Sequence, residues 1–255
     1  MTMLSIEDFS VSVEDKEVVR DVALSLTQGE MGVLMGPNGS GKSTLVNALM
    51  GHPHYTVTKG SVRLDGDDVT ALPVFEKAKR GLFLSLQHTP KIGGTTLAAF
   101  LHKAHTTMTG ETTDVLEYYL ALRETVKGYG IRDDLLDRPL SEGLSGGEKK
   151  LADMVQLIAL RPKVAILDEI DSGVDVDAMK TVFRTIDRLQ QEGTTFLLIS
   201  HYPALLDHLA PSSVHLMAAG CLVRRAGREL AEEIHRDGFC KAIACPMIEE
   251  CGSKA

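Results

Sequence analysis

The sequence has no tryptophan, few aromatic residues and only four cysteines among 255 residues. Four cysteines are too few for a disulfide scaffold, and three of them crowd into the last sixteen positions. No apolar run approaches the roughly 18 residues of a membrane-spanning helix, and the N-terminal segment carries acids instead of a basic start and an apolar core. We therefore expect a soluble, cytoplasmic protein that disulfides do not hold together and that does not insert into a membrane.

Positive charge is also in deficit, with 27 Lys and Arg against 35 Asp and Glu and a formal net charge of −8. A surface field of that sign repels polyanions, which argues against a nucleic-acid-binding protein. The hydrophobic content of 44% and the charged content of 24% are those of globular proteins. At roughly 150 residues per domain, the length indicates one large domain or one domain with a smaller inserted lobe.

Apolar periodicity predicts an N-terminal hairpin and then alternating strands and helices. Alternation of this kind indicates an α/β fold with a mostly parallel sheet. The expected strands are 4–13 with its return at 18–19, 31–35, 61–64, 82–86, 164–167 and 195–200, and the expected helices are 41–50, a short one from Pro73, 148–160, 175–191 and 202–209. Residues 95–127 lack strand signals and predict a helical lobe, so that 88–143 forms a subdomain within a single domain of 1–255, followed by a cysteine-containing tail, 236–255.

A glycine-rich segment lies between a predicted strand and a predicted helix and fits G-x-x-x-x-G-K-[ST] without a gap. Such a P-loop wraps backbone N–H groups around the phosphates of a nucleotide, while its lysine reaches the β and γ oxygens and its serine binds Mg²⁺. A decorative turn would require neither the lysine nor the serine. The segment consists of Gly36, Pro37, Asn38, Gly39, Ser40, Gly41, Lys42, Ser43 and Thr44.

Two carboxylates, Asp168 and Glu169, follow the apolar strand 164–167, at the end of the strand where open α/β sheets bind ligands. Alone, they would equally well be solvated acids. With a P-loop upstream, they indicate a Walker B segment in which Asp168 holds Mg²⁺, directly or through water, and Glu169 orients the water that attacks the γ-phosphorus.

The segment Leu144-Ser145-Gly146-Gly147-Glu148 resembles the signature of ATP-binding-cassette (ABC) ATPases. Ser145 and the amides of Gly146 and Gly147 would form a second phosphate-binding nest at a helix N-terminus. In the ABC family this nest belongs to the opposite subunit of a head-to-tail dimer that forms on ATP. The resemblance therefore implies that one chain carries half of each active site.

Gln87 and His201 complete the family order of motifs, so the resemblance covers position 4 to about 225. It implies that Gln87 senses Mg²⁺ and links the helical lobe to the catalytic lobe, and that His201 contacts the γ-phosphate. The implied fold is a P-loop core of ABC type with an N-terminal antiparallel β-subdomain and a small inserted helical lobe.

Within that family, the sequence resembles the ATPase subunit of the SUF iron-sulfur cluster assembly machinery. The features that carry this resemblance are Glu148-Lys149-Lys150, the run from Leu167 to Ala178, the pattern GxxxYxVTxGxV over 51–62, and Tyr202 after His201. It implies that ATP-driven dimerisation acts on soluble SUF-like scaffold subunits. The alternative is the nucleotide-binding subunit of a membrane transporter.

Two departures from the family concern the base and the partner. No aromatic residue occurs among positions 13–19, where many ABC ATPases stack the adenine on a tyrosine, which puts base selectivity in doubt. The stretch from Gln87 to Leu144 is shorter than in bacterial members and diverges after His88, in the region expected to grip partner subunits.

The third departure is a tail with Cys240, Cys245 and Cys251. With His235 and Cys221 as candidate fourth ligands, these thiols could hold zinc or an iron-sulfur cluster, and the chain would then be a metal-binding module with a regulatory ATPase. The spacing matches no strong template, so reduced free cysteines are the favoured interpretation.

Lys150 leaves two alternatives open. In the SUF family, a lysine after the signature can pair with the catalytic glutamate, here Glu169, and hold it away from water. Lysines are mostly exposed and unpaired, so a solvated lysine on a helix face is an equal alternative.

Overall fold

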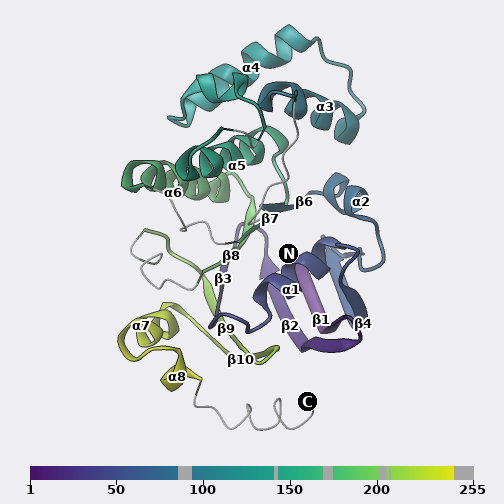
Figure 1. The fold of residues 1–255 in the computed structure, drawn as a ribbon, viewed down its shortest axis with the longest axis vertical. Coiled ribbons are helices and arrows are strands. Elements are labelled where there is room, and N and C mark those ends of the chain that lie inside the picture. Colours follow the sequence, from purple (N-terminus) through teal and green to yellow (C-terminus); the bar gives the residue numbers. More distant parts are fainter. Residues whose placement is uncertain (86–93, 141–142, 169–174, 201–205, 207, 244–255) are drawn as a thin grey trace.

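Two β-sheets and the helices packed on them make up the protein (Figure 1). The computed structural model describes residues 1–85, 94–140, 143–168, 175–200, 206 and 208–243. One sheet has four antiparallel strands and the other has six strands, five of them parallel. The predicted α/β class, with an antiparallel N-terminal subdomain and a largely parallel sheet, is confirmed.

The four-stranded sheet has the order β2-β1-β4-β5. Its first two strands form a hairpin whose turn residues, Glu14 and Asp15, both have positive φ, the geometry that matches the twist of the flanking strands. The strands run further than the alternation predicted, because register shifts interrupt the pattern near Asp8 and Asp21, which also have positive φ. The strands are β1 (Thr2–Val13), β2 (Lys16–Thr27), β4 (Thr56–Leu64) and β5 (Asp67–Asp68).

The six-stranded sheet has the order β10-β9-β3-β8-β7-β6, in which the last strand added, β10, is antiparallel to its neighbour. Sequence periodicity predicted the four neighbouring strands β3, β8, β7 and β6 and missed β9 and β10. The strands are β3 (Met31–Met35), β6 (Leu82–Ser85), β7 (Val164–Asp168), β8 (Thr195–Ile199), β9 (Ser213–Ala218) and β10 (Cys221–Ala226).

Both faces of this sheet are buried, which is why its central strands read as continuous apolar runs. In β7, Ala165 and Leu167 belong to the core shared with the helices, whereas Val164 and Ile166 belong to the core shared with the antiparallel sheet. The sheet is therefore packed on both faces, which keeps the ends of its strands in fixed positions relative to one another.

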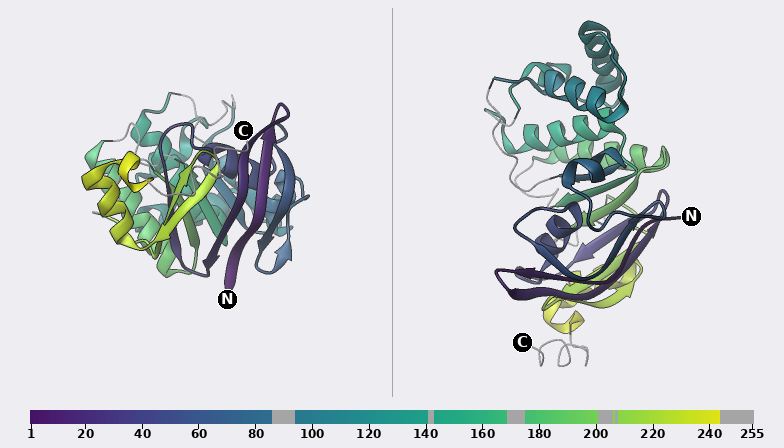
Figure 2. Two further views of the ribbon diagram at one scale, coloured as in Figure 1. Left: turned by 90° about the horizontal axis from the view of Figure 1, so that it is seen from below. Right: turned by 90° about the vertical axis from the view of Figure 1, so that its right-hand side faces the viewer.

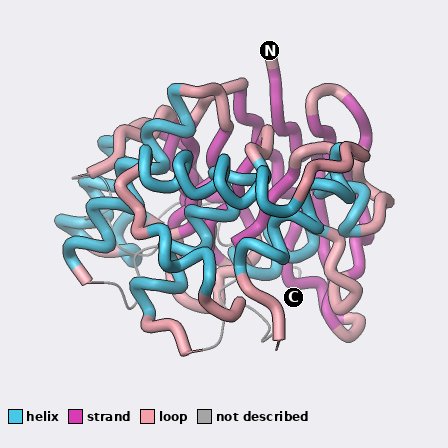
Figure 3. Tube along the Cα trace, turned by 90° about the horizontal axis from the view of Figure 1, so that it is seen from above, coloured by secondary structure: helices cyan, strands magenta, loops and turns pink. Residues whose placement is uncertain are grey.

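The helices lie in front of the strands when the molecule is seen from the end that carries the lobe (Figure 3). Helix α1 packs in the core between the two sheets through Leu45, Val46 and Leu49. The helices are α1 (Lys42–Met50), α2 (Val74–Lys79), α3 (Leu97–Thr109), α4 (Val115–Gly128), the 3-10 helix η1 (Asp133–Asp137), α5 (Gly146–Leu160), α6 (Val176–Gln191), α7 (Arg228–Asp237) and α8 (Phe239–Ala242).

Helices α3 and α4, with η1, extend from the body at one end of the molecule (Figures 1 and 2). Side-chain caps start both helices, at Thr96 and Asp114. Leu101 and Val126 are buried against the core that α5 also lines. Helices therefore occupy the described part of the region in which the sequence predicted a lobe; residues 88–93 and 141–142 of the predicted range 88–143 lie outside the described residues.

Residues 202–205 and 207 of the predicted helix 202–209 lie outside the described residues. Helix α7 was not predicted, because the resemblance ended near position 225. Within the described ranges, no helix combines the length and the apolar character that crossing a membrane requires.

Candidate functional site

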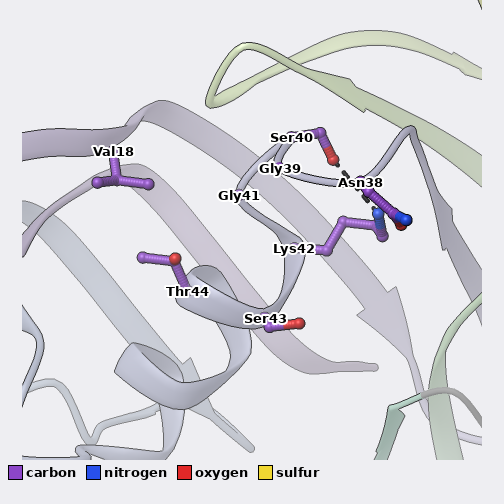
Figure 4. A pocket seen from close by; sticks show the side chains of 8 residues that line it. All are labelled: Val18, Asn38, Gly39, Ser40, Gly41, Lys42, Ser43 and Thr44. Atoms are coloured by element: carbon purple, nitrogen blue, oxygen red, sulfur yellow. Dashed lines mark hydrogen bonds between the residues drawn. The ribbon is translucent and has the colours of Figure 1, made fainter.

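The P-loop leaves β3 at Met35 and enters α1 at Lys42. A cavity of about 250 Å³ opens above it (Figure 4). Its lining comprises Val18 from β2 and the run from Asn38 to Thr44.

Two glycines explain why the loop takes this path. A Cβ on Gly36 would lie 2.2 Å from the backbone oxygen of Met217, so no larger residue fits where the loop leaves the sheet. Gly39 has φ +78, a conformation that L side chains rarely adopt, and a Cβ there would meet no atom within 4 Å. The loop is therefore open at Gly39 and closely packed against Met217 at Gly36.

The Lys42 ammonium lies folded against the loop, and its side chain is 7% exposed. It donates to the backbone oxygens of Gly36 at 2.7 Å and Pro37 at 3.0 Å, with the Ser40 hydroxyl at 3.4 Å (Figure 4). An ammonium has three donors and no acceptor, so these three oxygens hold its positive charge next to the loop. A loop of this kind binds phosphate through its backbone N–H groups.

Ser43, which lines the cavity, contacts Asp168 of β7, because the Ser43 hydroxyl donates to the Asp168 carboxylate at 3.2 Å. Asp168 is 4% exposed. Mg²⁺ prefers octahedral oxygen ligands at about 2.0–2.1 Å, which puts adjacent ligands about 3 Å apart. A hydroxyl and a carboxylate at this separation fit such an ion, either directly or through its water.

The parallel strands that precede the other predicted residues end at one edge of the sheet. Ser85 pairs with Leu167, Asp168 pairs with Ile199, and Leu34 also pairs with Ile199, so β6, β7, β8 and β3 end side by side. Gln87, Glu169 and His201 come one or two residues after these strand ends and lie outside the described residues. Their predicted roles stay predictions.

The signature segment starts α5. The Ser145 hydroxyl accepts from the Glu148 N–H at 3.2 Å, and the Glu148 carboxylate accepts from the Ser145 N–H at 2.8 Å, which forms a capping box. Hydrogen bonds from the Ser145 backbone N–H and the Ser145 side chain hold the pKa of the Glu148 carboxyl below its ordinary value. Ser145 and Gly146 are exposed, so the N-terminus of the helix is open to an anion from outside the chain.

Lys150 follows on the same helix and is 9% exposed. Its ammonium lies 3.5 Å from the Asp168 backbone oxygen. Of the two alternatives for this residue, a solvated surface lysine is excluded. A contact with Glu169 lies outside the described residues.

The turn between β9 and β10 supports the P-loop, which sequence reasoning missed. The Gly220 N–H donates to the Ser40 oxygen at 3.0 Å, and the Gly220 oxygen accepts from the Arg20 N–H at 2.9 Å. A Cβ on Gly220 would lie 2.2 Å from the Val18 oxygen. The pair Ala219-Gly220 is a turn signal, but the loop that it supports lies far away in the sequence.

The tail cysteines fall largely outside the described residues. Cys240 is free and exposed on α8, and Cys221 is disulfide-bonded at the start of β10. No group of three His, Cys, Asp or Glu side chains suited to a metal occurs in the described part of the chain. The disulfide removes Cys221 as a candidate fourth ligand and shows that the cysteines are not all reduced, contrary to expectation. Cys245 and Cys251 lie beyond the described part of the chain, and a metal site that uses them stays a prediction.

Comparison with known proteins gives relatives over nearly the whole chain. The family described as "ABC transporter" matches residues 19–172. The chain is 42% identical over 238 residues to "Vegetative protein 296" of Bacillus subtilis, covering 92% of this chain and 91% of that one. It is 37% identical over 241 residues to the "Probable ATP-dependent transporter SufC" of Escherichia coli, covering 93% of this chain and 97% of that one.

Among solved structures, the ADP conformation of an ATP-binding cassette of an ABC transporter aligns over 100% of both chains. The TM-score is 0.76 and the sequence identity is 24%. This likeness concerns the fold, and it includes both sheets and the helices of the lobe.

Proposed function

Because this chain belongs to the ABC ATPase family, as a SufC-like member that hydrolyses ATP, we propose that it binds Mg-ATP at the P-loop, dimerises head to tail on it, and drives conformational change in an iron-sulfur cluster assembly scaffold. The observation that carries the catalytic part is the contact between Ser43 and Asp168 at the mouth of the P-loop. It joins a hydroxyl and a carboxylate of Mg²⁺-binding type beside a loop built for phosphate.

The P-loop amides and Lys42 hold the β- and γ-phosphates. Ser43, Asp168 and Gln87 are the residues that would hold Mg²⁺. When it is bound, the ion would neutralise negative charge on the β- and γ-phosphates. Lys42 leaves the carbonyls of Gly36 and Pro37 and moves its charge to the phosphate oxygens.

Glu169 orients the attacking water and His201 contacts the γ-phosphate, each from the segment that follows its strand. Strands β7 and β8 are adjacent and parallel, so the segments that carry these two residues begin at the same edge of the sheet.

The second half of the site comes from a second copy of the chain. Ser145 and Gly146 form an exposed helix N-terminus, and the capping hydrogen bonds of Ser145 lie within the first turn of the helix. Such an end binds an anion through its free N–H groups, and the γ-phosphate on the partner's P-loop is that anion.

Mixing two inactive variants tests this geometry. Lys42→Met removes the phosphate-binding lysine, and Ser145→Arg blocks the signature nest. Each variant alone should lose turnover, whereas the mixture should recover activity, because a mixed dimer has one site with both halves intact. Recovery that is absent at every mixing ratio, in variants that remain folded, would contradict the head-to-tail dimer.

Iron-sulfur assembly as the purpose of the cycle is supported by the 37% identity to the SufC protein and by Glu148-Lys149-Lys150 after the signature. The dimerisation cycle would reach the scaffold through the Gln87 loop and the helical lobe.

The same relative is named an "ATP-dependent transporter", which supports a second candidate function: the nucleotide-binding subunit of a membrane transporter. The two functions share the ATPase site and differ in the partner, so identification of the partner separates them.

A further inference from the structure

A buried acid on the signature helix contacts the strand that leads to Gln87. Asp153 of α5 is 7% exposed, and its carboxylate accepts a hydrogen bond from the Ser85 hydroxyl at 2.7 Å. Ser85 is itself 3% exposed. Gln156, one turn further along the helix, donates to the other carboxylate oxygen at 3.3 Å.

The place of this contact in the fold ties it to the candidate site. Ser85 is the last residue of β6 and pairs with Leu167, the neighbour of Asp168. Lys150, three residues before Asp153 and hence on the same face of the helix, reaches the Asp168 backbone oxygen at 3.5 Å. Two side chains of α5 are thus attached to the site ends of β6 and β7.

Packing alone does not account for an acid here. The neighbouring residues Met154, Val155 and Leu157 are fully buried apolar side chains. Burial raises the pKa of the Asp153 carboxyl, so the charge is costly at this position and depends on its partners. A buried polar contact of this kind stabilises one arrangement of two elements over others that pack equally well.

We infer that the hydrogen bond between Asp153 and Ser85 makes both side chains positioning residues for ATP turnover: it fixes α5, and with it the signature segment 145–147, against the strand that enters the Gln87 loop. The inference rests on the proposed function, because it concerns how one chain presents its signature to the nucleotide of the other. Neither side chain lines the P-loop cavity, so binding of nucleotide to a single chain does not depend on the contact.

Ser85→Ala tests the inference in the full chain, with Thr185→Val as the matched control. Thr185 is a buried hydroxyl of α6 that donates within its own helix at 2.8 Å. For Ser85→Ala, turnover at saturating Mg-ATP should fall about tenfold while the ADP dissociation constant changes less than about twofold. Thr185→Val should lower the thermal midpoint to a similar extent and keep wild-type turnover.

Rescue and coupling separate positioning from general damage. Ser85→Thr keeps the hydroxyl and Asp153→Asn keeps a carbonyl acceptor for it, so both should retain most of the turnover. Combining Ser85→Ala with Asp153→Ala should lower turnover no further than Asp153→Ala alone, since both remove the same contact.

A second measurement does not depend on turnover. In the Glu169→Gln background, Ser85→Ala should raise the ATP concentration for half-maximal dimerisation about tenfold. Normal turnover and normal dimerisation in Ser85→Ala would overturn the inference and leave the proposed function intact. A wild-type chain that neither hydrolyses ATP nor dimerises in its presence would contradict both the inference and the proposed function.

Discussion

The Ser43 hydroxyl donates to the Asp168 carboxylate across 3.2 Å, which joins the first turn of the P-loop helix to the end of β7. These residues are 125 positions apart in the chain, and the contact forms because β3 and β7 flank β8 in one parallel sheet. The order of the strands thus brings together the two oxygens that we propose as ligands of Mg²⁺.

Ser43→Ala should remove most of the effect of Mg²⁺ on ATP binding, because one of the paired oxygens is lost. We expect the gain in ATP affinity on adding Mg²⁺ to fall by about tenfold, with binding of metal-free ATP nearly unchanged. Titration calorimetry with Mg²⁺ and with a chelator measures this. Ser5→Ala, which removes a hydroxyl of the antiparallel sheet, serves as the control, and an unchanged Mg²⁺ effect in Ser43→Ala would exclude Ser43 as a ligand.

Weak discrimination between nucleotide bases is expected, because the cavity wall next to the P-loop is Val18 and not an aromatic ring. ATP and GTP should compete for the site with dissociation constants within about tenfold of each other. Val18→Tyr should tighten ATP binding, since stacking of a base on an aromatic ring contributes about 1–3 kcal/mol. Val18→Leu is the control that adds bulk without a ring. A strong preference of the wild type for ATP would show that another residue reads the base.

Lys77 makes stability depend on pH. Its side chain is 1% exposed and its ammonium donates to the Leu49 oxygen at the end of α1 at 2.8 Å. Burial lowers the pKa of this amine from 10.5 to about 8. Between these two values the unfolded chain holds a proton that the folded chain has released, so the free energy of unfolding rises with pH across this window.

Urea unfolding at pH 8 and pH 10 tests this expectation by comparing wild type with Lys77→Met. The stability of the wild type relative to the variant should increase by about 2 kcal/mol over that interval. Lys79→Met removes an exposed lysine of the same short helix and should show no such change. A constant difference between wild type and Lys77→Met would mean that the amine keeps its proton in the folded state.

Lys150→Ala tests whether this buried lysine restrains turnover. Its ammonium lies 3.5 Å from the backbone oxygen of Asp168, the residue before Glu169. If it holds the glutamate away from water, removal should raise basal turnover of the isolated chain severalfold. Lys149→Ala, at the exposed neighbouring position, should leave turnover unchanged. Equal rates for Lys150→Ala and wild type would exclude the restraint.

The sequence predicted those parts of the fold that local pattern determines. Strand 31–35, the P-loop and the helix after it all lie where their residues indicated, because a glycine-rich turn between an apolar strand and a helix has few other solutions. Strand β9 was missed, since the buried polar residues Ser213 and His215 interrupt the kind of apolar run that identified the other buried strands.

Contacts between distant segments could not be predicted in the same way. The support that Gly220 gives to Ser40 and the bond from Ser85 to Asp153 depend on how the strands are ordered in the sheet. A buried Lys77 reads in the sequence as an ordinary charged residue of a short helix, and only the packing of α2 on the end of α1 shows what it contacts.

The most direct test of the central claim is an anaerobic affinity pull-down of wild type and Glu169→Gln from native lysate with ATP, with partners identified by mass. The Gln variant should trap the ATP-bound dimer, and we expect soluble SUF-like scaffold chains in stoichiometric amounts with both forms. A polytopic membrane protein in their place would contradict iron-sulfur cluster assembly and establish the chain as the ATPase of a transporter.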